Sequence, residues 1–204
     1  MNKKLLFAAI AAVPFLAAAQ SALAQDVYRT KAIAMLKKDF SKKGQADVDR
    51  LEEDAVQAVC NQSGNMPPAD IAKRMEADQM QTVKFPADGK LMGDWKKGEK
   101  IAQNGKGFTW RDKPGPIGGA CYNCHQIGPN EQAYGTIGTS LYQIGKIRGF
   151  TRETREYVYA KIYNAKAFNL CSDMPRFGHI GALTEENIKD LVALLTDPAS
   201  PVNQ

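Results

Sequence analysis

The sequence is poor in the residues from which most metal and catalytic sites are built. It contains two histidines and four cysteines in 204 residues, whereas a structural zinc site takes about four cysteine or histidine ligands. It shows no internal repeat and little of the strict apolar–polar alternation that is typical of strands. It also has no run of lysine and arginine interleaved with aromatic residues, as a nucleic-acid groove requires. These absences argue against a zinc protein, a β-rich fold and a nucleic-acid partner.

One long apolar run is present, and it lies at the N-terminus. Two lysines precede residues 5–19, and Ala22-Leu23-Ala24 closes the segment. A positive start, a short apolar core and an A-x-A end are the parts of a secretory signal peptide. The core is too short for a good membrane span, although an uncleaved anchor is the alternative. We predict cleavage after Ala24, export to the periplasm, and a mature chain with no membrane span.

Most of the remaining chain has apolar residues at helical spacing. Helices are expected over residues 28–40, 47–59, 69–80, 94–102, 151–162 and 184–195. Asp94 and Thr151 are the expected N-caps of two of them. The stretch Phe85-Pro86-Ala87-Asp88-Gly89 has the turn residues of a boundary. The sequence therefore predicts an all-α protein, with an N-terminal helical extension over residues 25–88 and a second domain over residues 89–204.

The chemistry is concentrated in Cys121-Tyr122-Asn123-Cys124-His125, which is the C-x-x-C-H signature of c-type haem attachment. Two thiols at this spacing on a tight turn can form thioethers with the two vinyl groups of one porphyrin. The histidine that follows is placed to present its imidazole to the iron from the same side. We therefore expect one covalent haem c, bound through Cys121 and Cys124, with His125 as an axial iron ligand.

Two other interpretations of this motif are open to test. A thioredoxin-like dithiol belongs in a βαβ setting, which the helical pattern does not provide. Half of a zinc site would need further cysteine or histidine ligands, and the chain has few. Both alternatives are weaker than haem, because the five-residue signature, the export signal and the helical surroundings agree.

The other two cysteines, Cys60 and Cys171, stand alone and far apart in the sequence. In an oxidising compartment such a pair is most simply a disulfide. Two unrelated buried thiols are the alternative. Neither cysteine has a histidine or a basic cluster beside it in the sequence to lower its pKa, so no catalytic residue is expected in this chain.

The second axial ligand has two candidates. Met174 is followed by Pro175, which stiffens an extended loop that can bring the thioether over the haem. His179 would instead give a bis-histidine site. The other methionines of the mature chain precede the haem motif and mostly fit helical core stripes, which is the usual role of methionine. We predict Met174, and a soft thioether ligand favours Fe(II) and raises the reduction potential.

At this point the residues resemble a known family. Trp95-Lys96-Lys97-Gly98-Glu99-Lys100, the haem motif and Gly135-Thr136-Ile137-Gly138 look like a mitochondrial-type (class I) cytochrome c domain. The segment from Met174 to Gly178, the helix start at Leu183-Thr184 and the tail from Asp197 to Asn203 look more narrowly like the SoxX family. Its members are the monohaem subunits of sulfur-oxidising SoxAX complexes. The resemblance covers residues 89–204 well and the N-terminal extension loosely.

The resemblance implies a function and partners. In such a complex, thiosulfate is oxidatively coupled to a cysteine of a carrier protein, an L-cysteine S-thiosulfotransferase activity. The implied partners are a SoxA-like cytochrome subunit that holds the catalytic cysteine, a SoxYZ-like carrier as substrate, and a downstream electron-acceptor cytochrome. The alternative is a free periplasmic cytochrome that shuttles electrons between larger complexes.

One position departs from the family pattern. The family has a proline after the G-x-x-G segment, near the carbonyl that accepts the axial histidine's ring N–H. Here Thr139 follows Gly138, and Pro129 is the other candidate. The sequence leaves open which carbonyl orients His125, a bond that fixes the imidazole and tunes the iron.

Overall fold

The computed structural model describes residues 27–44, 46–107, 109–113, 117–129 and 131–204. These residues form helices joined by loops, and the β-pairing among them is one isolated bridge between Lys43 and Ala46. This agrees with the predicted all-α class. The predicted signal peptide and its cleavage after Ala24 lie outside the described residues.

The chain divides into two compact units, Met1–Glu52 and Glu53–Gln204. In the first unit, residues 27–39 are helical and η1 covers Val48–Leu51. The prediction of one helix over residues 47–59 is wrong, because the chain leaves the helical conformation after η1 and a new helix starts at Ala55. The cause is a capping box: the Asp54 carboxylate accepts from Gln57 N, and Gln57 Oε1 accepts from Asp54 N.

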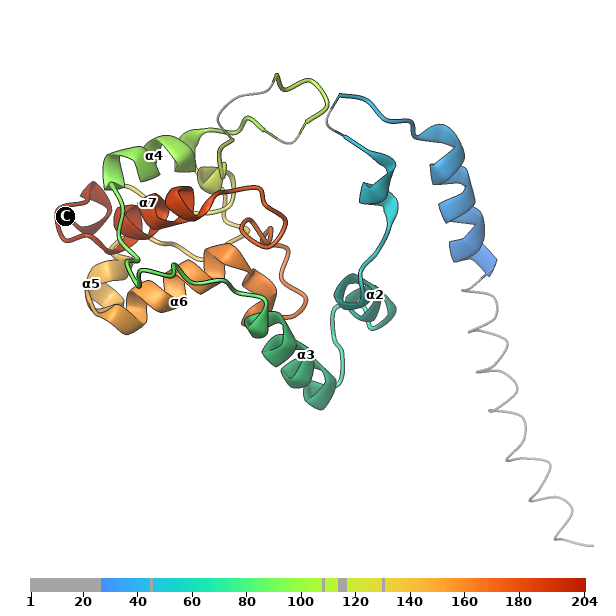
Figure 1. The fold of residues 1–204 in the computed structure, drawn as a ribbon, viewed down its shortest axis with the longest axis horizontal. Helices are drawn as coiled ribbons and strands as arrows, with labels where there is room; N and C mark the ends of the chain where they lie inside the picture. The colour runs from blue at the N-terminus through green and yellow to red at the C-terminus, as the bar shows by residue number, and fades with distance from the viewer. Residues whose placement is uncertain (1–26, 45, 108, 114–116, 130) are drawn as a thin grey trace, which may run out of the picture. The chain divides into compact units, whose positions relative to one another are not determined.

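The second unit contains the other helices, which Figure 1 shows in chain order. They are α2 (Ala55–Gln62), α3 (Ala69–Gln81), α4 (Trp95–Gln103), η2 (Cys121–Asn123), α5 (Ile144–Arg148), α6 (Arg152–Tyr163), η3 (Ala165–Ala167), α7 (Glu185–Thr196) and η4 (Pro201–Asn203). The predicted caps are present, since Asp94 accepts from Lys96 N and Thr151 accepts from Thr154 N. Residues 53–88 belong to the same compact unit as residues 89–204. The predicted domain boundary after Asp88 stays a prediction.

The core of the second unit is built around α7, where every residue from Ile188 to Thr196 is buried. Helices α4 and α7 lie side by side, as both ribbon views show. Gly98 makes this close packing possible, because a Cβ at this position would overlap the carbonyl of Asp190. The partly buried residues that pack on this core include Cys121 and Met174, so the α4–α7 pair supports both parts of the predicted site.

We expect Gly98→Ala to lower the free energy of unfolding by about 1–3 kcal/mol, because the added methyl forces α4 away from α7. Thermal or denaturant unfolding measures this change. Gly105→Ala is the matched control, since the nearest atom to its added Cβ is the Ala120 Cβ at 3.9 Å. Equal stability of the two variants would contradict the packing described for Gly98.

Candidate functional site

The Cys121–His125 motif forms one tight turn. Ala120 has a left-handed backbone (φ +47°) and leads into η2. The carbonyl of Cys121 then accepts from Cys124 N at 3.1 Å and from His125 N at 2.9 Å. These bonds hold the two cysteines and the histidine together within one short turn of the chain.

The turn is fixed to the C-terminal end of α4. Gly119 N donates to the carbonyl of Ile101 at 2.9 Å, and Ala120 N donates to the carbonyl of Asn104 at 3.1 Å. A Cβ on Gly119 would lie 2.9 Å from the Cys121 sulfur. The glycine-rich approach to the motif therefore lets the chain pass close to this thiol.

The loop over residues 135–141 runs alongside the motif and is joined to it by three backbone hydrogen bonds. Gly135 N donates to Tyr122 O at 2.9 Å, Gly138 N to Cys124 O at 2.8 Å, and Leu141 N to Gln126 O at 2.8 Å. A Cβ on Gly135 would overlap the carbonyl of Asn123. Glycine at this position thus lets the two segments approach closely.

This loop orients the imidazole of His125. The ring Nδ1 lies 2.7 Å from the carbonyl oxygen of Thr139, so Nδ1 carries the proton and donates it to that carbonyl. Nε2 is then left with its lone pair free to bind a metal. The structure thus answers the question that the sequence left open, in favour of Thr139 over Pro129. The ring also packs on Gly138, where a Cβ would overlap three of its atoms.

His125 and Met174 line the same cavity, which has a volume of about 310 Å³. Much of the rest of its lining is aliphatic, from Leu141, Ile144, Val158, Ile162 and Leu195. An apolar cavity with a few convergent ligating atoms is the usual form of a cofactor site, for which volumes of about 300–1,000 Å³ are typical. An imidazole and a thioether that share a mostly apolar cavity are a donor set that suits haem iron, although neither Cys121 nor Cys124 is among the residues that line it.

The two candidates for the second ligand lie in different surroundings, and the choice between them stays a prediction. His179 does not line this cavity, and its backbone N–H donates to the carbonyl of Tyr163 at 3.0 Å. Among the earlier methionines, Met75 of α3 packs on a hydrophobic cluster as predicted, and Met92 packs on the core from the loop before α4 instead of from a helix. Met35 and Met66 do not, since they are 62% and 81% exposed. The placement of Met174 supports it as the ligand.

The thiol environment bears on the alternatives to haem. Burial raises the pKa of the Cys121 thiol to about 12, whereas a redox-active cysteine needs a lowered pKa to form its thiolate. Among the described residues, no group of three or more His, Cys, Asp or Glu side chains is placed to hold a metal ion. Neither observation favours a thioredoxin-like dithiol or a zinc site.

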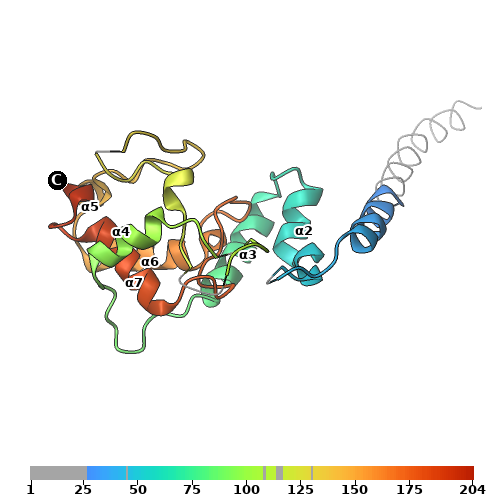
Figure 2. The ribbon, with the colours of Figure 1, turned by 90° about the horizontal axis from the view of Figure 1, so that it is seen from above.

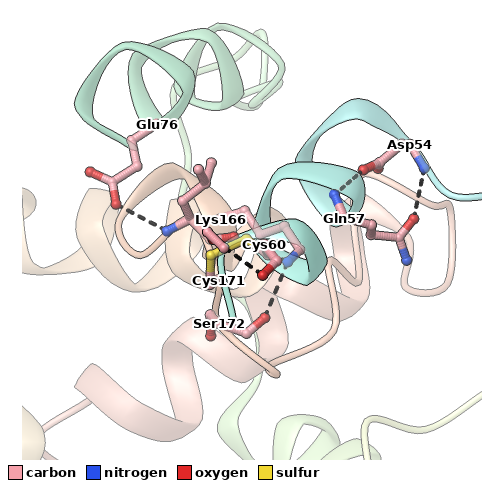
Figure 3. Close-up of a disulfide and its surroundings, with 9 residues drawn as sticks. Asp54, Gln57, Cys60, Glu76, Lys166, Cys171 and Ser172 are labelled. Carbon is pink, nitrogen blue, oxygen red and sulfur yellow. Dashed lines mark hydrogen bonds between the residues drawn. A yellow bond between two sulfur atoms is a disulfide. The ribbon is translucent and has the colours of Figure 1, made fainter. Parts of the chain in front are cut away.

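Cys60 and Cys171 form a disulfide, with the sulfur atoms 2.04 Å apart, as the sequence predicted. Figure 3 shows that it joins α2 to the loop that follows η3. The Asp54 carboxylate, at the N-cap of α2, also pairs with Arg176 on the same loop. Sequence reasoning did not identify this ion pair, because nothing in the local pattern connects residues so far apart.

Comparison with known proteins finds a relative that aligns over its full length. A protein of Aquifex aeolicus (strain VF5) described as an uncharacterized lipoprotein is 36% identical over 211 aligned positions, which span the whole of both chains. No family model matches the chain. Within the part of the chain that the structure describes, no helix is both long and apolar enough to cross a membrane.

Proposed function

This chain belongs to the family of the Aquifex aeolicus lipoprotein, and within that family we propose that it is a monohaem c-type cytochrome that transfers electrons. The observation that carries the proposal is the cavity shared by His125 and Met174, next to the Cys121–Cys124 turn. Cys121 and Cys124 would hold the haem covalently, and His125 Nε2 and the Met174 sulfur would be its axial ligands.

The geometry supports electron transfer over substrate chemistry at the iron. A haem bound here supplies one-electron redox chemistry. With His125 and Met174 as its two ligands, a bound haem would have no free iron position for a substrate. Thr139 holds the proton of His125 on Nδ1, and much of the lining around the two candidate ligands is aliphatic. These features favour a stable ligand set over an open catalytic site.

We further propose that the protein is the electron-transfer subunit of a SoxAX-type complex. Coupling thiosulfate to a cysteine thiol through a new sulfur–sulfur bond releases two electrons, which a monohaem subunit passes on one at a time. The SoxA-like partner would supply the catalytic cysteine, and the SoxYZ-like carrier would be the substrate. Support comes from the resemblance of the Met174 loop and the C-terminal tail to SoxX.

The tail has a structural role that fits this resemblance. Asn203 is buried; its amide donates to the carbonyls of Leu195 and Asp197, and its Oδ1 accepts from Gly145 N at 3.0 Å. These bonds join α5 to the end of α7, and residues of both helices line the His125 cavity. The tail therefore supports the shape of the site and contributes none of its ligands.

We propose the periplasm as the location, after cleavage behind Ala24. The Aquifex relative is described as a lipoprotein. Bacterial lipoproteins are exported, so this likeness supports an exported location for the chain.

Purification of the protein from its native host tests the complex. We expect a second cytochrome subunit to co-purify in equal amount through ion exchange and gel filtration at high salt. An obligate subunit buries a large apolar interface, so such a pair survives dilution and salt. A lone haem-containing monomer would contradict the subunit proposal and favour the electron shuttle, while leaving the haem assignment intact.

A further inference from the structure

We infer that α2 and α3 act as a brace that positions Met174, chiefly through the Cys60–Cys171 disulfide and the Asp54–Arg176 ion pair. This inference rests on the proposed ligation of haem by His125 and Met174. It assigns to the N-terminal extension a role at the axial ligand, which the haem domain alone does not provide.

The two ties bracket Met174 on both sides. Cys171 lies three residues before it and is covalently bound to Cys60 of α2. Arg176 lies two residues after it and pairs with Asp54, the N-cap residue of the same helix. Both ends of the short segment that carries the thioether are therefore fixed to α2.

Further contacts hold the start of the loop, where Figure 3 shows Glu76 and Lys166 near the disulfide. Leu170 N donates to the Glu76 carboxylate of α3 at 2.9 Å, and Lys166 Nζ donates to the Leu170 carbonyl at 3.1 Å. Val56, Cys60 and Leu170 form a small buried cluster of their own. Helices α2 and α3 thus pack directly on the base of the Met174 loop.

The α3 helix is itself fixed to the core of the unit. Asn164, at the end of α6, is fully buried, and its amide donates to Gln79 Oε1 at 3.0 Å and to Thr82 Oγ1 at 2.9 Å. A buried amide that keeps its hydrogen bonds specifies one arrangement of the groups around it. The brace therefore has a rigid attachment from which to hold the loop.

The loop needs these ties because it is not packed on both sides. Met174 lines the His125 cavity and also a second cavity of about 410 Å³, together with Cys60, Cys171 and Arg176. Met174 is only partly buried against the core, and a side chain that borders two pockets has fewer contacts to fix it in place. Without the disulfide and the ion pair, the Met174 side chain has room to move away from His125.

The expected consequence is a weaker sixth ligand. A tethered ligand competes with ligands from solution through its effective concentration at the iron, which falls when the tether loosens. An external ligand such as imidazole should then bind more readily. The covalent attachment of the haem and the ligation by His125 should not change, because neither contacts the brace.

The test compares the wild-type holoprotein with the double variant Cys60→Ser/Cys171→Ser, each with its haem iron in the ferric state. We expect the double variant to keep its full haem content and Soret band, to lose intensity in the weak far-red band of methionine-ligated ferric haem, and to bind imidazole about tenfold more tightly or more. Asp54→Asn, which keeps the helix cap but removes the charge, should shift imidazole binding in the same direction by a smaller factor. This variant is also informative if the double variant does not fold.

Asp94→Ala is the control for general destabilisation, because it removes only the N-cap bond to Lys96 N, at the end of α4 opposite the haem motif, and touches neither the Met174 loop nor the brace. We expect it to lower the melting temperature with unchanged imidazole affinity. Wild-type affinity in both the disulfide variant and Asp54→Asn would overturn the inference. So would an equal rise in Asp94→Ala. A wild-type protein without covalent haem would overturn the proposed function, and the missing Soret band distinguishes that failure.

Discussion

Replacing Gly138 by alanine is expected to displace the imidazole of His125 and to convert the haem to a high-spin, weakly ligated state. A Cβ at this position would overlap three atoms of the imidazole ring. The loop cannot retreat easily, because Gly138 N is bonded to the Cys124 carbonyl at 2.8 Å. The ring must therefore move, and the Thr139 bond that orients it at 2.7 Å is lost.

The visible and electron paramagnetic resonance spectra of purified Gly138→Ala measure this effect. We also expect a loss of about 1–3 kcal/mol in the free energy of unfolding, the usual cost of overpacking. Gly128→Ala is the matched control in the same region, since the nearest atom to its added Cβ is the Tyr122 hydroxyl at 3.7 Å. A low-spin, wild-type spectrum for Gly138→Ala would contradict the described contact between the glycine and the ring.

Replacing Met174 by leucine is the second change with a large expected effect. Leucine has nearly the same volume, so the cavity wall is kept while the ligating sulfur is removed. We expect retention of covalent haem, loss of the methionine-dependent far-red band, and a fall in reduction potential on the order of 100 mV or more. A redox titration followed by absorbance measures the far-red band and the reduction potential, and the Soret band reports the haem content.

His179→Ala is the control, because His179 is the alternative ligand and does not line the His125 cavity. We expect its spectrum and potential to match those of the wild type. A variant set in which His179→Ala loses low-spin ligation and Met174→Leu keeps it would support a bis-histidine site. That result would also remove the basis for the brace.

Local patterns gave the parts of the structure that depend on neighbours in the sequence. The caps at Asp94 and Thr151 were predictable because a short polar side chain preceding a helical apolar pattern satisfies the first free N–H groups. The same reasoning failed over residues 47–59. Apolar spacing continues there, but the reciprocal bonds of Asp54 and Gln57 start a new helix at Ala55.

At the candidate site, too, some features follow from local sequence patterns and others depend on the tertiary fold. Cys121, Cys124, His125 and Met174 were predicted as haem residues from motif and loop chemistry alone, and that assignment stays a prediction. The Thr139 carbonyl was only one of two candidates, because backbone acceptors carry no residue signature and their position depends on the fold of the loop. The Asp54–Arg176 pair and the second pocket that Met174 lines are products of tertiary packing, which no spacing in the sequence encodes.

The intact mass of the protein under denaturing conditions tests the central claim most directly. We predict the mass of a chain beginning at Gln25, with one disulfide and one haem that stays attached in acid and organic solvent. Thioether bonds to Cys121 and Cys124 survive these conditions, whereas a haem held by axial ligands alone dissociates. The mass of the bare polypeptide would contradict covalent attachment and, with it, the assignment as a c-type cytochrome.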